Sequence, residues 1–83
     1  MDALDGNAIA GLLMEVFGED MTTTIGVCGN CGARGPVAET TVYMRAPGVV
    51  VRCRSCTAIL MVFSRVREVT TVDLLGLRSL EAT

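Results

Sequence analysis

The chain has 83 residues, of which 51% are hydrophobic, and it carries a formal net charge of −2 with no histidine. This length allows one small domain, and domains of this size often depend on a metal, disulfides or a second chain for stability. The missing histidine excludes Ser/His and Cys/His catalytic pairs and any zinc site of mixed Cys and His ligands. From the length we therefore expect a single domain over 1–83. Because a glycine-rich phosphate loop and paired carboxylates are also lacking, we expect that it is not an enzyme.

The first predicted element is an N-terminal helix over 1–18. Apolar residues recur there at the spacing of one helical stripe: Ile9, Leu12, Leu13 and Val16. Asp5 is a good N-cap, Asp2 is an alternative, and Gly18 is a natural stop. We expect this helix to depend on docking against the rest of the domain.

Residues 21–75 change to short runs with β character, which predict a small antiparallel sheet. The expected strands are 21–27, 40–44, 49–52, 58–63 and 69–74. Pro47 and Gly48 favour a turn, so the second and third strands form a hairpin. The apolar fourth strand is predicted to be central, with the fifth pairing back onto it.

The end of the chain, 76–83, is expected to be a short tail of weak helical or frayed character. No segment is long enough to act as a linker between two domains. The first residues lack the basic region of a secretory signal, and the longest apolar run, 58–63, is too short to span a bilayer. We therefore expect a cytoplasmic protein with no membrane contact.

Four cysteines form the pattern Cys28-x2-Cys31-x21-Cys53-x2-Cys56. Zinc in structural sites takes four ligands in a tetrahedron, and one CxxC turn supplies two of them from one side. The intervening hairpin brings the second turn to face the first. The spacing predicts one Zn²⁺ on the four thiolates.

Other chemistries use similar cysteines. A rubredoxin-like iron centre has the same paired CxxC geometry and is the main alternative metal. A redox dithiol needs only one pair and, in the thioredoxin context, a βαβ pattern that this chain lacks. Two disulfides are disfavoured because persistent disulfides are rare in the cytoplasm.

The residues beside the cysteines support the metal interpretation. Gly32 follows the first pair, where a metal-binding turn favours positive φ. Thr57 holds the equivalent place after the second pair, which predicts a slightly different turn there. Arg52 and Arg54 flank Cys53 and are expected to offset the negative charge of four thiolates on one Zn²⁺.

On these motifs, residues 25–60 resemble a zinc ribbon, and the four ligands carry over onto the four cysteines. The whole chain also resembles a family of short uncharacterised actinobacterial proteins, a domain of unknown function. The genes of that family tend to lie near oxidoreductase genes, so the resemblance implies a redox enzyme as partner. The expected fold is α+β, with the N-terminal helix packed on a small antiparallel, rubredoxin-like zinc-ribbon sheet.

These features predict a non-catalytic, zinc-stabilised module that mediates protein–protein interaction. The candidate contact residues are Arg52, Arg54, Leu12 and Met14. The hydrophobic fraction is high and the sheet is open, so the apolar surface is larger than one short helix can cover. This excess predicts a homodimer or another protein partner.

A nucleic-acid-binding ribbon is the alternative function, since residues 21–67 hold six arginines and one acid. We expect that binding to be weak, because the chain is acidic overall and has few aromatic side chains for stacking. A rubredoxin-like iron centre would imply a third function, electron transfer.

Overall fold

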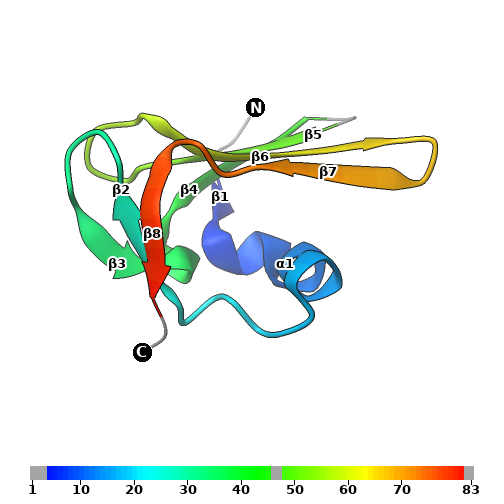
Figure 1. The fold of residues 1–83 in the computed structure, drawn as a ribbon, viewed down its shortest axis with the longest axis horizontal. Helices are drawn as coiled ribbons and strands as arrows, with labels where there is room; N and C mark the ends of the chain where they lie inside the picture. The colour runs from blue at the N-terminus through cyan, green and yellow to red at the C-terminus, as the bar shows by residue number, and fades with distance from the viewer. Residues whose placement is uncertain (1–3, 46–47, 82–83) are drawn as a thin grey trace.

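The computed structural model describes residues 4–45 and 48–81. β-strands are the main secondary structure, and they form two antiparallel sheets (Figure 1). The larger sheet has the strand order β1-β4-β5-β6-β7. Its strands are β1 (Leu4–Asp5), β4 (Thr41–Arg45), β5 (Gly48–Arg52), β6 (Ile59–Val66) and β7 (Val69–Asp73). The larger sheet contains both predicted hairpins, because β4 pairs with β5 and β6 pairs with β7.

The smaller sheet has the order β3-β2-β8 and lies at one end of the larger one (Figure 1). Its strands are β2 (Ile25–Cys28), β3 (Arg34–Pro36) and β8 (Leu77–Glu81). A 3-10 turn, η2 (Val37–Glu39), connects β3 to β4. The smaller sheet therefore joins the segment after the helix to the end of the chain.

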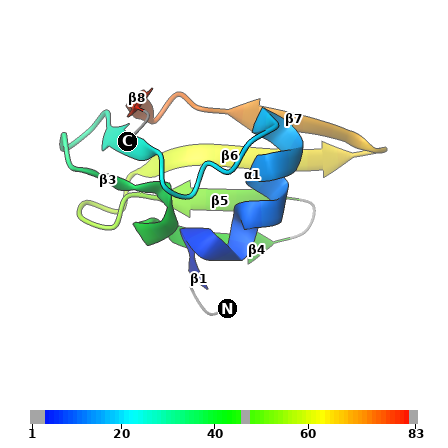
Figure 2. The ribbon, with the colours of Figure 1, turned by 90° about the horizontal axis from the view of Figure 1, so that it is seen from below.

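The helical segment covers one face of the larger sheet (Figures 1 and 2). It consists of a 3-10 turn, η1 (Gly6–Ile9), followed by α1 (Ala10–Phe17). The Asp5 carboxylate accepts a hydrogen bond from the backbone N–H of Asn7 and caps the segment, and Gly18 ends it at φ +77°. The predicted cap and stop are confirmed.

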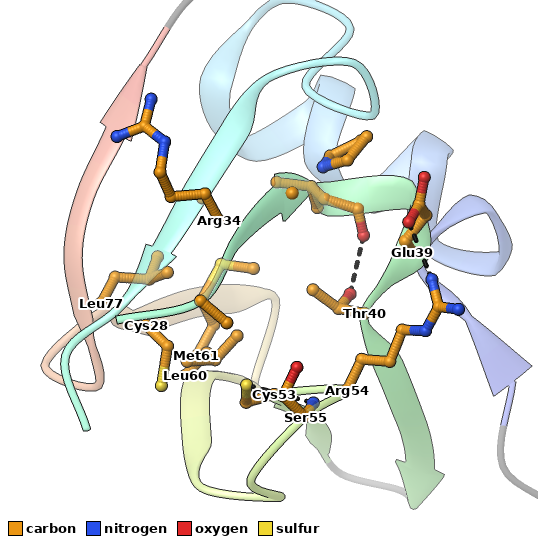
Figure 3. Close-up of a pocket in the computed structure, with 15 residues that line it drawn as sticks. Cys28, Arg34, Glu39, Thr40, Cys53, Arg54, Ser55, Leu60, Met61 and Leu77 are labelled. Carbon is orange, nitrogen blue, oxygen red and sulfur yellow. Dashed lines mark hydrogen bonds and ion pairs between the residues drawn. The ribbon is translucent and has the colours of Figure 1, made fainter. Parts of the chain in front are cut away.

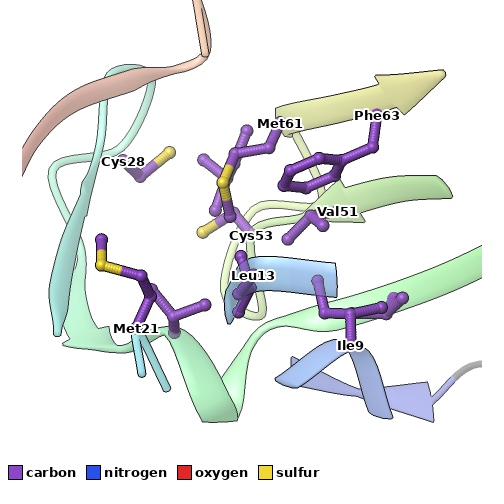
Figure 4. Packing of buried hydrophobic residues seen from close by; sticks show 11 residues of the cluster. Ile9, Leu13, Met21, Cys28, Val51, Cys53, Met61 and Phe63 are labelled. Carbon is purple, nitrogen blue, oxygen red and sulfur yellow. The ribbon is translucent and has the colours of Figure 1, made fainter. Parts of the chain in front are cut away.

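The core lies between the helix and the larger sheet. Ile9 and Leu13 from the helical segment pack in one cluster with Val51, Met61 and Phe63 from the sheet (Figure 4). All five side chains are at most 2% exposed. The cluster continues into the buried cysteines at 28 and 53, so the candidate metal centre and the apolar core are in contact.

The predicted α+β class is wrong, because residues 4–45 and 48–81 form eight strands in two sheets and one short α-helix instead of a helix packed on a small ribbon. The α-helix spans Ala10–Phe17, and the preceding residues form a 3-10 turn and the short strand β1. The expected tail is also different, since Leu77–Glu81 pairs with β2 as β8. Pairing with distant strands determines the secondary structure of the N-terminal and C-terminal segments. The local sequence pattern gives no information about such pairing.

Some predictions fall outside the described residues. The alternative cap at Asp2, the turn residue Pro47 and the last two residues of the tail are among them. Within 4–45 and 48–81, no helix has the length and apolar character needed to cross a membrane.

Candidate metal centre

The structure brings the four cysteines together at the junction of the two sheets. Cys28 ends β2, Cys53 directly follows β5, and Cys31 and Cys56 lie three residues after them. All four Sγ atoms lie within 4.8 Å of one another. The cysteines are free thiols, so the disulfide alternative is not what the structure shows.

The distances between the two turns fit a tetrahedral metal site. The Sγ atoms of Cys28 and Cys56 are 3.7 Å apart, and those of Cys31 and Cys53 are also 3.7 Å apart. Four sulfurs at about 2.3 Å from a central Zn²⁺ define a tetrahedron with edges of about 3.8 Å. The donor set therefore matches a four-thiolate site in number and type, and these two distances match its spacing.

The two cysteine turns have the same backbone hydrogen bonds. We call residues 28–33 the first knuckle and residues 53–58 the second knuckle. The N–H of Gly32 donates to the Cys28 carbonyl at 3.0 Å, and the N–H of Thr57 donates to the Cys53 carbonyl at 2.9 Å. Gly32 has φ +78° and Thr57 has φ +65°. The expected difference between the two turns is therefore wrong, because Thr57 adopts the left-handed conformation of Gly32.

Backbone N–H groups point at the sulfurs in both knuckles. In the first, the N–H of Asn30 donates to the Cys28 Sγ at 3.3 Å, and in the second the N–H of Ser55 donates to the Cys53 Sγ at 3.4 Å. The Asn30 side-chain amide also reaches across to the Cys56 Sγ at 3.4 Å. Hydrogen bonds of this kind stabilise thiolates, which are the form that binds metal.

The pKa values of the thiols reflect these contacts. The Asn30 amide and then the backbone N–H of Ala58 lower the pKa of Cys56 to about 6. The backbone N–H of Cys31 lowers the pKa of Cys28. The backbone N–H of Ala33 favours the Cys31 thiolate, but desolvation and the neighbouring thiols outweigh it and raise the pKa of Cys31 to about 11. The hydrogen bonds around Cys56 thus favour its thiolate form.

The two flanking arginines occupy different surroundings. The Arg52 guanidinium donates to the Thr57 carbonyl at 2.9 Å and lies 5.9 Å from the centre of the Tyr43 ring. Arg54 is exposed and pairs with the Glu39 carboxylate at 2.8 Å. Arg52 therefore supports the second knuckle directly, whereas the charge of Arg54 is balanced by an acid.

Other arginines of the basic segment are also paired. Arg34 contacts Glu81 at 2.7 Å, and Arg65 contacts Glu15 of α1 at 2.5 Å. Like the Arg54 pair, these pairs are solvent-exposed, where an ion pair contributes roughly 0–1 kcal/mol. The charge excess of residues 21–67 is thus reduced by acids on neighbouring elements, which weakens the case for a phosphate-binding face.

The remaining predicted contact residues lie on α1, away from the cysteines. Leu12 is half-buried against the core, and Met14 is 48% exposed. The role of Asn30 was not predicted from the sequence, although a side-chain amide inside a CxxC turn is a sign of a contact to a thiolate. The other missed feature is a cavity beside the knuckles, which has no local sequence signal because it depends on tertiary packing.

Comparison with known proteins gives one match. A family model described as "Family of unknown function (DUF6510)" matches residues 1–83. No curated protein and no solved structure matches the chain. The expected relation to a family of unknown function is confirmed, whereas the actinobacterial source and the zinc-ribbon class stay predictions.

Proposed function

The chain belongs to this family of unknown function, and we propose that it is a non-catalytic protein-binding module stabilised by one Zn²⁺. The observation that carries the proposal is the pair of 3.7 Å Sγ–Sγ distances between the two knuckles. They match the edge of about 3.8 Å in a zinc tetrathiolate. Cys28, Cys31, Cys53 and Cys56 would hold the metal.

The non-catalytic part of the proposal rests on the closed character of such a site. When all four ligands come from the protein, no position stays open for water or substrate. The chain has no histidine, and the acids Glu15, Glu39 and Glu81 each pair with an arginine at the surface. The geometry favours a structural metal over a reactive one.

Metal analysis tests the proposal. Protein expressed natively and without a tag should contain one metal per chain, with zinc in excess of iron, and chelation should remove the cooperative unfolding transition. The buried cysteines belong to the same apolar cluster as the helix and sheet, so metal loss should disrupt the core as well. Well under one metal per reduced chain would contradict the proposal, and a coloured iron-loaded protein would favour electron transfer.

The binding part of the proposal is supported by the second face of the larger sheet. The helical segment covers one face only (Figures 1 and 2). Alternation along the strands places the cross-strand row Tyr43, Val50 and Val62 on the opposite face. These three side chains are half-buried. A second copy of the chain or another protein would cover them.

Sedimentation of the metal-loaded protein tests self-association. At micromolar concentration we expect a dimer, and Val62→Arg on this face should shift it to monomer. The control is Leu75→Arg, because Leu75 is 90% exposed in the loop between β7 and β8 and is not one of the predicted contact residues. A monomer at all concentrations would exclude the homodimer.

A further inference from the structure

A cavity of about 300 Å³ lies between the second knuckle and the β3–η2 segment (Figure 3). Its inner wall is buried and mainly apolar, and it includes two of the cysteines. The buried lining residues are Cys28, Val37, Cys53, Leu60 and Met61. Exposed residues from both sides form the rim: Arg34, Glu39, Arg54 and Ser55. The cavity is therefore an apolar recess that opens to solvent beside the candidate metal centre.

The strand at this recess is an edge strand. β3 is the outer strand of the smaller sheet and pairs only with β2 among the described residues. The hydrogen bonds from Cys28 N–H to the Ala33 carbonyl and from Val37 N–H to the Thr24 carbonyl show which residues face β2. In an antiparallel ladder the alternate residues turn their backbone groups away from the partner strand. Arg34 therefore presents a free N–H and carbonyl on the outer edge, and Pro36 presents a carbonyl.

The glycine between them keeps the recess open. Gly35 lines the cavity, and a Cβ built on it meets no atom within 4 Å. Its φ is not in the left-handed region, so a side chain is compatible with the backbone there. A glycine in a strand is typical of a place where another backbone approaches closely. A strand added to the edge of β3 would direct the side chain opposite Gly35 into the recess.

The rim charges are balanced within the protein. Arg34 pairs with Glu81 at one side, and Arg54 pairs with Glu39 at the other. The recess thus offers an apolar wall and strand-edge hydrogen bonds, without a net charge that would select an ion. Its volume is at the lower end of the range for small-molecule sites, which suits one or two apolar side chains better than a nucleotide-sized cofactor.

We propose that this recess binds an extended peptide segment of a partner protein, which adds as a strand to the edge of β3 and inserts an apolar side chain beside Gly35. In such complexes the main-chain hydrogen bonds supply affinity and the side-chain pocket supplies specificity. The inference rests on the proposed function, because the metal holds the second knuckle that forms one wall. Peptide binding is accordingly expected only in the metal-loaded protein.

A heptapeptide library displayed on phage and selected on the full, metal-loaded chain tests the proposal. Enriched peptides should carry alternating apolar residues, and synthetic copies should shift the amide signals of Arg34, Gly35 and Ser55 in ¹⁵N spectra. Gly35→Phe should weaken their binding at least tenfold, since phenylalanine is favoured in strands and its ring would fill the recess. Ser55→Trp on the opposite wall should do the same.

Gly11→Phe is the matched control, because Gly11 is exposed on α1 and a Cβ there also meets nothing within 4 Å. It should leave peptide binding unchanged. Failure to enrich any peptide, shifts confined to other surfaces, or equal binding by Gly35→Phe with one metal per chain would overturn the inference. Those outcomes leave the metal-stabilised module intact, whereas a chain without metal would contradict the proposed function itself.

Discussion

The first and second knuckles hold their cysteines with the same backbone hydrogen bonds but with different residues. Position 32 is glycine and position 57 is threonine, yet both have φ between +60° and +80°. For a β-branched residue this conformation costs roughly 1–3 kcal/mol. The comparison indicates that the geometry needed to gather four sulfurs determines the turn, and that the residue at that position only determines its energetic cost.

The knuckles also differ in what lies outside them. In the first, the N–H of Gly29 donates to the Gly76 carbonyl at 2.9 Å, so this knuckle is docked on the segment before β8. In the second, Arg54 and Ser55 are exposed and form part of the cavity rim. The first knuckle is thus anchored on the segment before β8, whereas the second supplies exposed residues to the rim of the recess.

The largest effect should come from removing one ligand from either knuckle. Cys31→Ser in the first and Cys56→Ser in the second should both abolish stable metal binding and unfold the domain at room temperature. Structural zinc supplies about 10 kcal/mol or more of apparent binding free energy in small domains. Metal content and circular dichroism provide the measurement. If one variant kept its metal and its unfolding transition, the two knuckles would not share one site.

The next effect tests the packing of the segment on which the first knuckle docks. A Cβ on Gly76 would lie 1.8 Å from the Ile59 carbonyl oxygen, so Gly76→Ala forces the backbone to move. We expect the free energy of unfolding to fall by about 3 kcal/mol in chemical denaturation. Gly11→Ala on the exposed helix face is the control and should be neutral or stabilising by up to about 1 kcal/mol. A Gly76→Ala variant as stable as the parent would show that this close contact does not constrain the backbone.

Asn30 and Ser55 occupy equivalent positions, but only Asn30 donates a side-chain hydrogen bond to a sulfur. Asn30→Ala should weaken metal binding about tenfold, and Ser55→Ala should not change it. Loss of the donor raises the pKa of Cys56 from about 6. Protons then compete better for the thiolate, so acid should release the metal at a higher pH than in the parent. Competition with a chromophoric chelator measures both quantities, and equal behaviour of the two variants would contradict the role of Asn30.

The smallest effect concerns the residue with positive φ. Thr57→Gly should stabilise the metal-loaded protein by about 0.5 kcal/mol, because the relief of backbone strain exceeds the added entropy of the unfolded chain. Gly32→Ala should destabilise it by about 1 kcal/mol for the opposite reason. Thermal unfolding at fixed metal concentration is the measurement. Changes of the same sign in both variants would show that the knuckles are not equivalent.

The sequence by itself determined the candidate ligands and the local pairing of strands. Paired CxxC motifs have few uses, and the turn residues and short connections around β4–β5 and β6–β7 specify hairpins locally. The cap at Asp5 and the stop at Gly18 are likewise local features, which explains why they could be read directly.

Only the tertiary structure determined three features: the second sheet, the division of the N-terminal segment into a strand and a helix, and the recess beside the metal centre. β8 pairs with β2 across about fifty residues of sequence, and its leucines at 77 and 80 do not follow strict strand alternation. Thr57 takes a conformation that its own preference opposes, because it closes the knuckle that brings Cys53 and Cys56 to the other two sulfurs. Local propensities are worth a fraction of a kcal/mol per residue, whereas burial of a side chain or binding of a metal contributes several, so the long-range contacts prevail.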